Sequence, residues 1–213
     1  MPTENERSIY NLDVAYKIAC EQLAKADIEE QCRRSDAQYE VKESKKTITI
    51  QHLNRSYLIT VPDIDVSLVD STENVPLREK ILILHYFLQA KGTKTTNKLI
   101  AFRELPGGNV YHPTFVKRTM KPLTDNFGRE PALLVSTGKR LGGYEADYGD
   151  TAVTINAFSR VPITLVLWQG DDELPPQLNL LFDSSISDYL ETEDVTVLCE
   201  TLTWRLIGYL REA

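Results

Sequence analysis

Three apolar runs near the end of the chain, joined by short connections, constrain the fold most. The runs are TAVTINA at 151–157, ITLVLW at 163–168 and QLNLLF at 177–182. The connection at 158–162 is short enough for a hairpin, and the loop at 169–176 also suits antiparallel neighbours. We therefore expect the three runs to form an antiparallel meander, with KLIAFR at 98–103 in the same sheet.

The rest of the chain alternates helical and strand-like patterns. In order, we expect a helix at 9–34, a three-stranded meander at 39–61, a helix from Pro76 to Gly92, a strand at 98–105, helices at 113–126 and 131–141, the C-terminal meander, and a helix at 193–211. This order lacks the strand–helix–strand alternation of a parallel sheet. It predicts a single α+β domain over 1–213, with a mostly antiparallel sheet packed against several helices.

Charge and hydropathy exclude some classes of partner. The 213 residues carry a net charge of -7, so the chain should repel nucleic acid and gains nothing from an anionic membrane. Its longest apolar stretch, ILILHYFL at 81–88, is too short to span a bilayer. The first residues, MPTENERS, are polar and do not resemble a signal peptide. We expect a cytoplasmic protein.

The cysteines do not form a ligand set. Cys20, Cys32 and Cys199 are widely spaced and include no C-x-x-C pair. This spacing argues against a disulfide framework, a zinc site or an iron–sulfur cluster held by this chain. We predict that elemental analysis of the purified protein finds no stoichiometric zinc or iron, and the sequence leaves any cofactor unknown.

A first candidate site is the segment Arg103-Glu104-Leu105-Pro106-Gly107-Gly108, followed by Tyr111. The two glycines can adopt positive φ and expose backbone N–H groups. Arg103 can bind a carboxylate or a phosphate bidentately. The alternative is a tight turn in which Arg103 pairs with a neighbouring acid, because Pro-Gly-Gly is typical of turns.

A second candidate is Trp168 with Asp171, Asp172 and Glu173. Carboxylates that follow a strand can bind a hard cation through oxygen, but this spacing does not match an EF-hand loop. The alternative is a solvated acidic loop with Trp168 covering the core.

A third candidate is the acidic stretch after the last strand. It comprises Asp183, Ser184, Ser185, Asp188, Glu193 and Asp194. Asp183 suits the role of a helix cap equally well. The histidines add no recognisable set: His52 falls in a turn, His85 lies in an apolar helix and should be a core residue, and His112 lies beside Tyr111.

The antiparallel meander separates the second and third candidates. Trp168 ends its strand at one end of the sheet, so Asp183 must fall at the opposite end, near Ser159 and Arg160. Arg103 can join only one of them, and the sequence does not fix the direction of its strand. We predict no catalytic or metal-binding residue, and a ligand site at Arg103, Glu104, Gly107, Gly108, Tyr111, Trp168, Asp172 and Glu173. If Arg103 lies beside Asp183, the third candidate replaces it.

Several motifs in the second half occur together and in order. They are ILILHYFLQAKG, FRELPGGNVY, LGG, LWQGDDELPP and LFDSSISDYLETED. In this order they resemble domain of unknown function family 3786, found largely in anaerobic bacteria and archaea. Some relatives are joined to a cysteine-rich iron–sulfur segment of the kind seen beside corrinoid-dependent one-carbon enzymes. The resemblance therefore implies an iron–sulfur or corrinoid protein as a partner, because this chain lacks that segment.

Three functions remain open at this stage. The leading interpretation is an accessory or ligand-binding protein, linked through the resemblance to anaerobic corrinoid or one-carbon metabolism. The first alternative is an enzyme that acts on a small anionic substrate through Arg103, Glu104 and Asp172 or Glu173. The second is a protein-interaction module without a ligand. A large pocket would favour the first two, and shifted carboxylate pKa values within it would favour the enzyme. The oligomeric state is not predicted.

Overall fold

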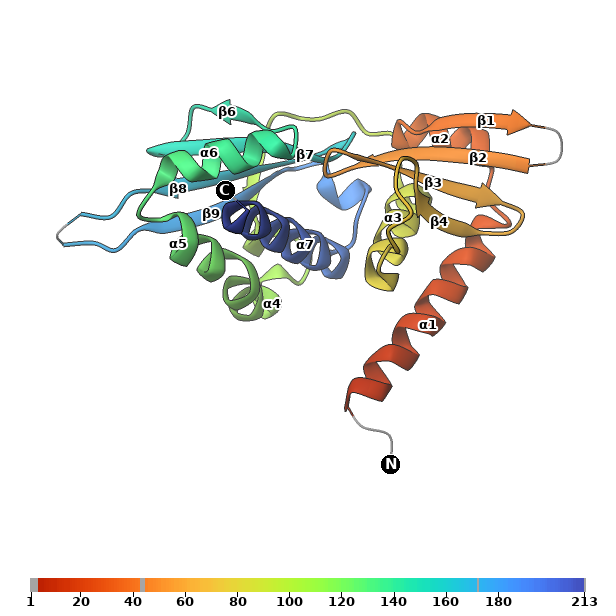
Figure 1. Ribbon diagram of the computed structural model, residues 1–213, viewed down its shortest axis with the longest axis horizontal. Coiled ribbons are helices and arrows are strands. Elements are labelled where there is room, and N and C mark those ends of the chain that lie inside the picture. The colour runs from red at the N-terminus through yellow and green to blue at the C-terminus, as the bar shows by residue number, and fades with distance from the viewer. Residues whose placement is uncertain (1–3, 43–44, 172, 213) are drawn as a thin grey trace.

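One antiparallel sheet organises the molecule (Figure 1). The computed structural model describes residues 4–42, 45–171 and 173–212. Over these residues nine strands pair in the order β4-β3-β2-β7-β8-β9-β5, with β1 beside β2 and β6 beside β7. The strands are β1 (Gln38–Lys42), β2 (Lys45–His52), β3 (Arg55–Val61), β4 (Asp65–Leu68), β5 (Leu99–Ala101), β6 (Tyr144–Ala146), β7 (Thr151–Phe158), β8 (Val161–Trp168) and β9 (Gln177–Asp183).

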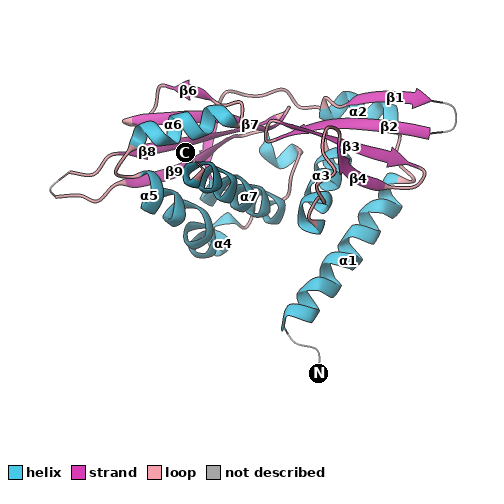
Figure 2. Cartoon of the chain, in the orientation of Figure 1, coloured by secondary structure: helices cyan, strands magenta, loops and turns pink. Residues whose placement is uncertain are grey.

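Most helices lie along the sheet, while α1 (Glu4–Leu23) packs against α3 (Leu77–Gln89) and extends away from the sheet (Figure 2). The others are α2 (Ile28–Ser35), α4 (Gly108–Phe115), a π-helical stretch at Val116–Met120, α5 (Lys121–Phe127), α6 (Pro131–Arg140) and α7 (Thr192–Arg211), with short 3₁₀ turns at Phe102–Glu104 and Ile186–Asp188. The fold is α+β, as predicted. No helix in the described ranges combines the length and the apolarity that crossing a membrane requires.

The predicted C-terminal meander is confirmed. Ile155 pairs with Ile163, and Leu165 pairs with Leu180, both in antiparallel register. The 98–103 segment joins the same sheet through β5, where Ile100 pairs with Phe182. Helix α6 packs on one face of β7, which buries the side chains that point to that face, such as Val153 and Ile155.

Two predicted elements have different boundaries. The single helix expected at 9–34 is two helices, because Asp27 begins a second one by accepting the backbone N–H of Glu30. The strand expected at 98–105 ends at Ala101. There the Glu104 carboxylate accepts the N–H of Ala101 and closes a 3₁₀ turn. Arg103 therefore lies in a turn and not at the end of a strand.

Other segments extend or add to the prediction. The helix expected from Pro113 already begins at Gly108. Strands β4 and β6 were not predicted, and both are short strands paired on one side of a neighbour. The predicted three-stranded meander is present as β1, β2 and β3.

The two halves of the sheet meet at a narrow junction. Strand β2 of the N-terminal half (α1 to α3) pairs with β7 of the C-terminal half (β5 to α7) where His52 lies opposite Phe158. Tyr86 of α3 stacks on Phe158, with ring centroids 4.0 Å apart. One hydrophobic core runs through both halves. Side chains at this junction therefore hold the halves together.

The turn before α4 depends on close backbone approach. A Cβ atom at Gly108 would lie 2.0 Å from the carbonyl oxygen of Phe102, whose ring stacks on Phe115 at 3.8 Å. We expect Gly108→Ala to lower the free energy of unfolding by about 1–3 kcal/mol, because the backbone must shift to fit the methyl group. Urea denaturation followed by circular dichroism measures this loss.

Gly208→Ala is the matched control for that experiment. A Cβ atom at Gly208 meets nothing within 4 Å. The substitution should raise stability by about 0.5–1 kcal/mol, because alanine favours a helix interior over glycine. A Gly108→Ala variant as stable as the Gly208→Ala variant would contradict the tight approach.

Candidate functional site

The predicted residues around Arg103 lie at the start of α4 and face α7. Gly107 has φ +71, and Arg103 and Glu104 are exposed. The Tyr111 hydroxyl donates to the Glu193 carboxylate at 3.2 Å. A cavity of about 410 Å³ beside it is lined by residues of the 106–111 and 187–193 segments. The structure thus brings this first candidate to the N-terminal end of α7.

The predicted residues of the acidic loop lie at the end of β8. Trp168 is 42% exposed and lies against Gly149. The Asp171 carboxylate accepts the backbone N–H groups of Glu173 and Leu174, so it closes its own turn. Asp172 lies outside the described residues. A pocket shared by the Arg103 turn and this loop stays a prediction.

The sequence left open which way the strand at 98–103 runs, and the pairing of β5 fixes its direction. Leu99 pairs with Asp183, and Ala101 pairs with Leu181. Strand β5 therefore runs away from Asp183 and toward the end of the sheet where Trp168 pairs with Gln177. Asp183 itself accepts N–H groups from Thr96, Asn97 and Ser185, so it organises the surrounding turns.

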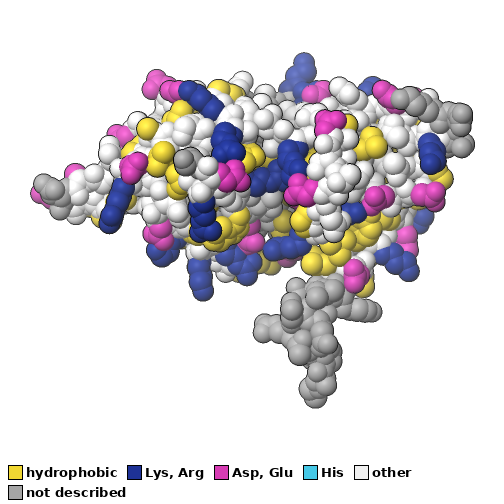
Figure 3. All heavy atoms as spheres, in the orientation of Figure 1, with side chains coloured by type: hydrophobic (Ala, Val, Ile, Leu, Met, Phe, Trp, Pro, Cys, Tyr) yellow, Lys and Arg dark blue, Asp and Glu magenta, His cyan; other side chains and the backbone are white. Residues whose placement is uncertain are grey.

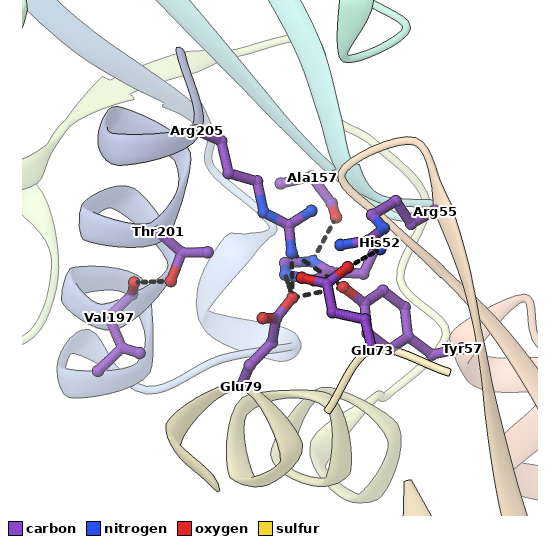
Figure 4. Close-up of polar contacts among 9 residues, drawn as sticks. All are labelled: His52, Arg55, Tyr57, Glu73, Glu79, Ala157, Val197, Thr201 and Arg205. Carbon is purple, nitrogen blue, oxygen red and sulfur yellow. Dashed lines mark hydrogen bonds and ion pairs between the residues drawn. The ribbon is translucent and has the colours of Figure 1, made fainter. Parts of the chain in front are cut away.

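A buried polar cluster forms at the junction between the two halves, and the sequence did not predict it (Figure 4). It consists of His52, Tyr57, Glu79 and Arg205. Arg205 reaches from α7 in the C-terminal half, whereas the other three residues belong to β2, β3 and α3 of the N-terminal half.

The β2–β3 hairpin explains how three groups reach one face. His52 lies directly opposite Arg55 in the antiparallel register, and Tyr57 lies two residues beyond Arg55. Residues two apart on a strand, and residues directly opposite, point to the same side of a sheet. Leu53 and Asn54 both have positive φ, as the tight turn between the strands requires.

Glu79 is the centre of the cluster. Its Oε1 atom accepts the Tyr57 hydroxyl at 2.5 Å and also accepts Nη2 of Arg205. Nη2 of Arg205 donates to the Tyr57 oxygen as well, at 2.9 Å. Glu79 is only 8% exposed, so its charge is compensated by the arginine and not by water.

Two buried nitrogens of the cluster have no hydrogen-bond partner among the described residues, namely Nε2 of His52 and Nη1 of Arg205. The Nδ1 atom of His52 lies 2.9 Å from the carbonyl oxygen of Ala157, so Nδ1 carries the proton. Burial and the charge of Arg205 lower the pKa of His52 to about 3. At neutral pH the cluster therefore has one unused donor, Nη1 of Arg205, and one unused acceptor, Nε2 of His52, which lies 3.5 Å from Oε1 of Glu79.

A cavity of about 530 Å³ opens above this cluster. Its rim carries the ion pair between Arg55 and Glu73, at 2.6 Å. On the α7 side it is bounded by Tyr209, which lies under the guanidinium of Arg140 at 3.9 Å, and by Glu212. In Figure 3, basic and acidic side chains gather at the middle of the face, where the two halves meet. The cavity is therefore a polar cleft between the halves, a common place for ligand sites.

Tyr57 and His85 have environments that the sequence did not reveal. Burial, together with the hydrogen bond to Glu79, raises the pKa of Tyr57 to about 12. The prediction that His85 is a core residue is wrong, because its side chain is 28% exposed and Nδ1 lies 2.8 Å from Asp194. That contact raises the pKa of His85.

Within the described part of the chain, no group of three or more His, Cys, Asp or Glu side chains is arranged to hold a metal ion.

The buried histidine should make the protein sensitive to acid. The folded pKa of His52, about 3, lies below its unfolded value, so the unfolded state binds more protons between these values and stability falls as the pH falls. Between about pH 7 and about pH 5 we expect His52 to account for a loss of about 2 kcal/mol. Urea denaturation at several pH values measures it.

His52→Asn is the comparison variant, because it removes the titrating group. It should be less stable at neutral pH, yet it should lose less stability on acidification than the wild-type chain. His85 works in the opposite sense, since its raised pKa favours the folded state until the pH rises through that value. Equal acid sensitivity of the two chains would contradict a neutral, buried His52.

Comparison with known proteins identifies a family. No curated protein matches the chain, and no solved structure matches it. The sequence model of the family described as "Domain of unknown function (DUF3786)" matches residues 27–205, from α2 into α7. The match includes all four cluster residues and covers most of the 213-residue chain. The chain therefore belongs to the DUF3786 family.

Proposed function

We propose that the protein is a ligand-binding accessory protein, and that the cleft between its halves takes a small molecule with both an acceptor oxygen and a cationic group. The observation that carries this proposal is the unpaired Nη1 of Arg205, a buried donor on a residue that lines the cleft. A buried guanidinium nitrogen without an acceptor is costly, and a ligand oxygen would relieve that cost.

The charges around the cleft favour a zwitterion over a simple anion. Each carboxylate around the cleft is paired with an arginine, Glu73 with Arg55, Glu79 with Arg205 and Glu212 with Arg140. The paired groups leave the cleft without net charge, and a molecule with a carboxylate and an ammonium group would match both signs along it. The ligand class is therefore amino-acid-like.

The proton affinities favour binding over catalysis. A general acid or base works best with a pKa near the working pH. The pKa of His52 is about 3 and that of Tyr57 is about 12, so neither group exchanges protons readily near neutral pH. An enzyme that uses this cluster for acid–base chemistry is the less favoured alternative. The iron–sulfur or corrinoid protein partner implied by the family resemblance stays a separate prediction.

Thermal-shift and calorimetric titrations test the proposal. The probes are glycine and β-alanine, compared with acetate and methylamine at matched ionic strength. The zwitterions should stabilise the wild-type chain by mass action, and the two single-charge probes should not. Arg205→Lys keeps the charge beside Glu79 but loses the second guanidinium nitrogen, so it should abolish the shift. Equal responses of the two chains, or no response to either zwitterion, would reject the proposed site.

A further inference from the structure

A second cavity lies on the other face of the C-terminal half of the sheet. Gly138 of α6 packs against Val153, and Gly143 packs against Ile155. Alternate residues of a strand point to opposite faces, so Thr154 and Asn156 point away from α6. They line a cavity of about 400 Å³ on that outer face, which we call the outer-face pocket.

The walls of the outer-face pocket are fixed by the fold. On one side, Tyr144 of β6 pairs with Thr154 of β7. On the other side, the buried carboxylate of Asp183 accepts the N–H groups of Thr96 and Asn97 at 3.0 and 2.7 Å. Asp183 thus positions the loop that carries Asn97, so hydrogen bonds to β9 hold this wall of the pocket in place.

Several polar groups in the outer-face pocket have unused hydrogen-bonding capacity. The hydroxyls of Thr154 and Thr164 lie 2.8 Å apart and bond to each other, which uses one of their two hydrogens. Both threonines are more than nine-tenths buried. Asn156, Tyr144 and Tyr148 make no side-chain hydrogen bond to any residue that the structure describes. Donors and acceptors therefore converge on the pocket from three strands and a loop.

The lining also determines the charge of a suitable ligand. It contains no lysine, arginine or histidine, and its one carboxylate, Asp183, is occupied by the 96–97 turn and Ser185. A phosphate or carboxylate would find no cation here. Tyr144 and Tyr148 are 55% and 48% exposed and offer flat apolar faces with polar tips.

We propose that the outer-face pocket binds an uncharged, hydroxyl-rich ring, such as a monosaccharide unit or a ribose. The tyrosines contact the apolar face of the ring, and Thr154, Asn156 and Thr164 bond its hydroxyls. A few convergent polar groups beside aromatic surface are the usual composition of a small-molecule site. This inference concerns a different face of the sheet from the cleft at Arg205 and does not depend on it.

Nuclear magnetic resonance titration of the ¹⁵N-labelled full chain tests the inference. The probes are glucose, galactose, ribose and adenosine, with glucose 6-phosphate and glycerol as comparisons. A neutral ring should give saturable shifts around the outer-face pocket, while the phosphate and the open-chain polyol should not. Stronger shifts with adenosine than with ribose would assign the ring to a nucleoside, and stronger shifts with glucose or galactose would assign it to a sugar.

Exposed side chains provide variants that should fold normally. Tyr148→Ala and Asn156→Ala together should weaken binding by about tenfold or more, which corresponds to the loss of about 1.4 kcal/mol. Tyr111→Ala, an exposed tyrosine beside α7, is the matched control and should leave binding unchanged. Arg205→Lys should also leave it unchanged. No saturable shift with any neutral ring, or shifts that persist in the double variant, would overturn the inference.

Discussion

Replacing Arg205 with alanine is expected to lower the free energy of unfolding by about 3–5 kcal/mol, because it leaves a buried carboxylate without its counter-charge. Glu79 is 8% exposed and is bonded by Tyr57 and Arg205. Without the guanidinium, the carboxylate stays buried and keeps only the hydrogen bond from Tyr57. Chemical denaturation followed by circular dichroism measures the loss.

A surface arginine gives the matched control. Arg118 donates to Glu200 at 3.0 Å, but its side chain is 55% exposed and Arg78 also lies near that carboxylate. Arg118→Ala should therefore cost less than about 1 kcal/mol. The double variant Glu79→Gln with Arg205→Met removes both charges and keeps an acceptor for Tyr57, so it should lose less stability than Arg205→Ala alone. Equal losses of stability in Arg118→Ala and Arg205→Ala would show that the buried ion pair contributes no more to stability than the exposed one.

The sequence predicted those parts of the fold that local patterns determine. The runs at 151–157, 163–168 and 177–182 pair as expected because apolar runs joined by short connections leave few other arrangements. The two halves of the 9–34 segment share a helical pattern, but a single side-chain cap at Asp27 divides them. Such a cap favours the start of a new helix through a single hydrogen bond, and the spacing of the apolar residues does not reveal that bond.

The direction of β5 is a feature of the fold that local sequence patterns do not determine. Nothing in the residues 98–103 fixes which way the strand runs, because either direction buries the same apolar side chains. The pairing of Leu99 with Asp183 settles it, and that pairing depends on the loop that Asp183 holds through Thr96 and Asn97. The relevant bonds join residues more than 80 positions apart in the chain.

The polar cluster at the junction could not be assembled from the sequence for the same reason. Its members come from two hairpin strands and two helices, and Arg205 is 126 positions from Glu79. One weak signal was present: Arg205 lies between Leu202 and Tyr209 on the apolar stripe of α7, where a charge needs a buried partner. The prediction that His52 falls in a turn is wrong, because it is the last residue of β2 and fully buried, and its sequence neighbours give no sign of this.

Phe158→Ala is expected to lower the free energy of unfolding by about 3–5 kcal/mol and also to weaken the coupling between the two halves. Phe158 is fully buried, and its ring stacks on His52 at 4.4 Å and on Tyr86 at 4.0 Å. It belongs to the pair through which β2 joins β7. Removing the ring takes out the aromatic contact between α3, β2 and the C-terminal half, and leaves the hydrogen bonds of Arg205 in place.

The two tryptophans make this coupling measurable. Trp168 and Trp204 both lie in the C-terminal half, whereas circular dichroism reports on the whole chain. In the wild-type protein we expect both signals to change in one coincident transition, as a single domain requires. In Phe158→Ala the two transitions should separate. Phe127→Ala, which removes a fully buried ring from α5 away from the junction, should cost a similar free energy but keep the transitions coincident. Separate transitions already present in the wild-type chain would show two domains where we predict one. Coincident transitions in Phe158→Ala would show that other contacts, such as the Arg205 cluster, are sufficient to couple the halves.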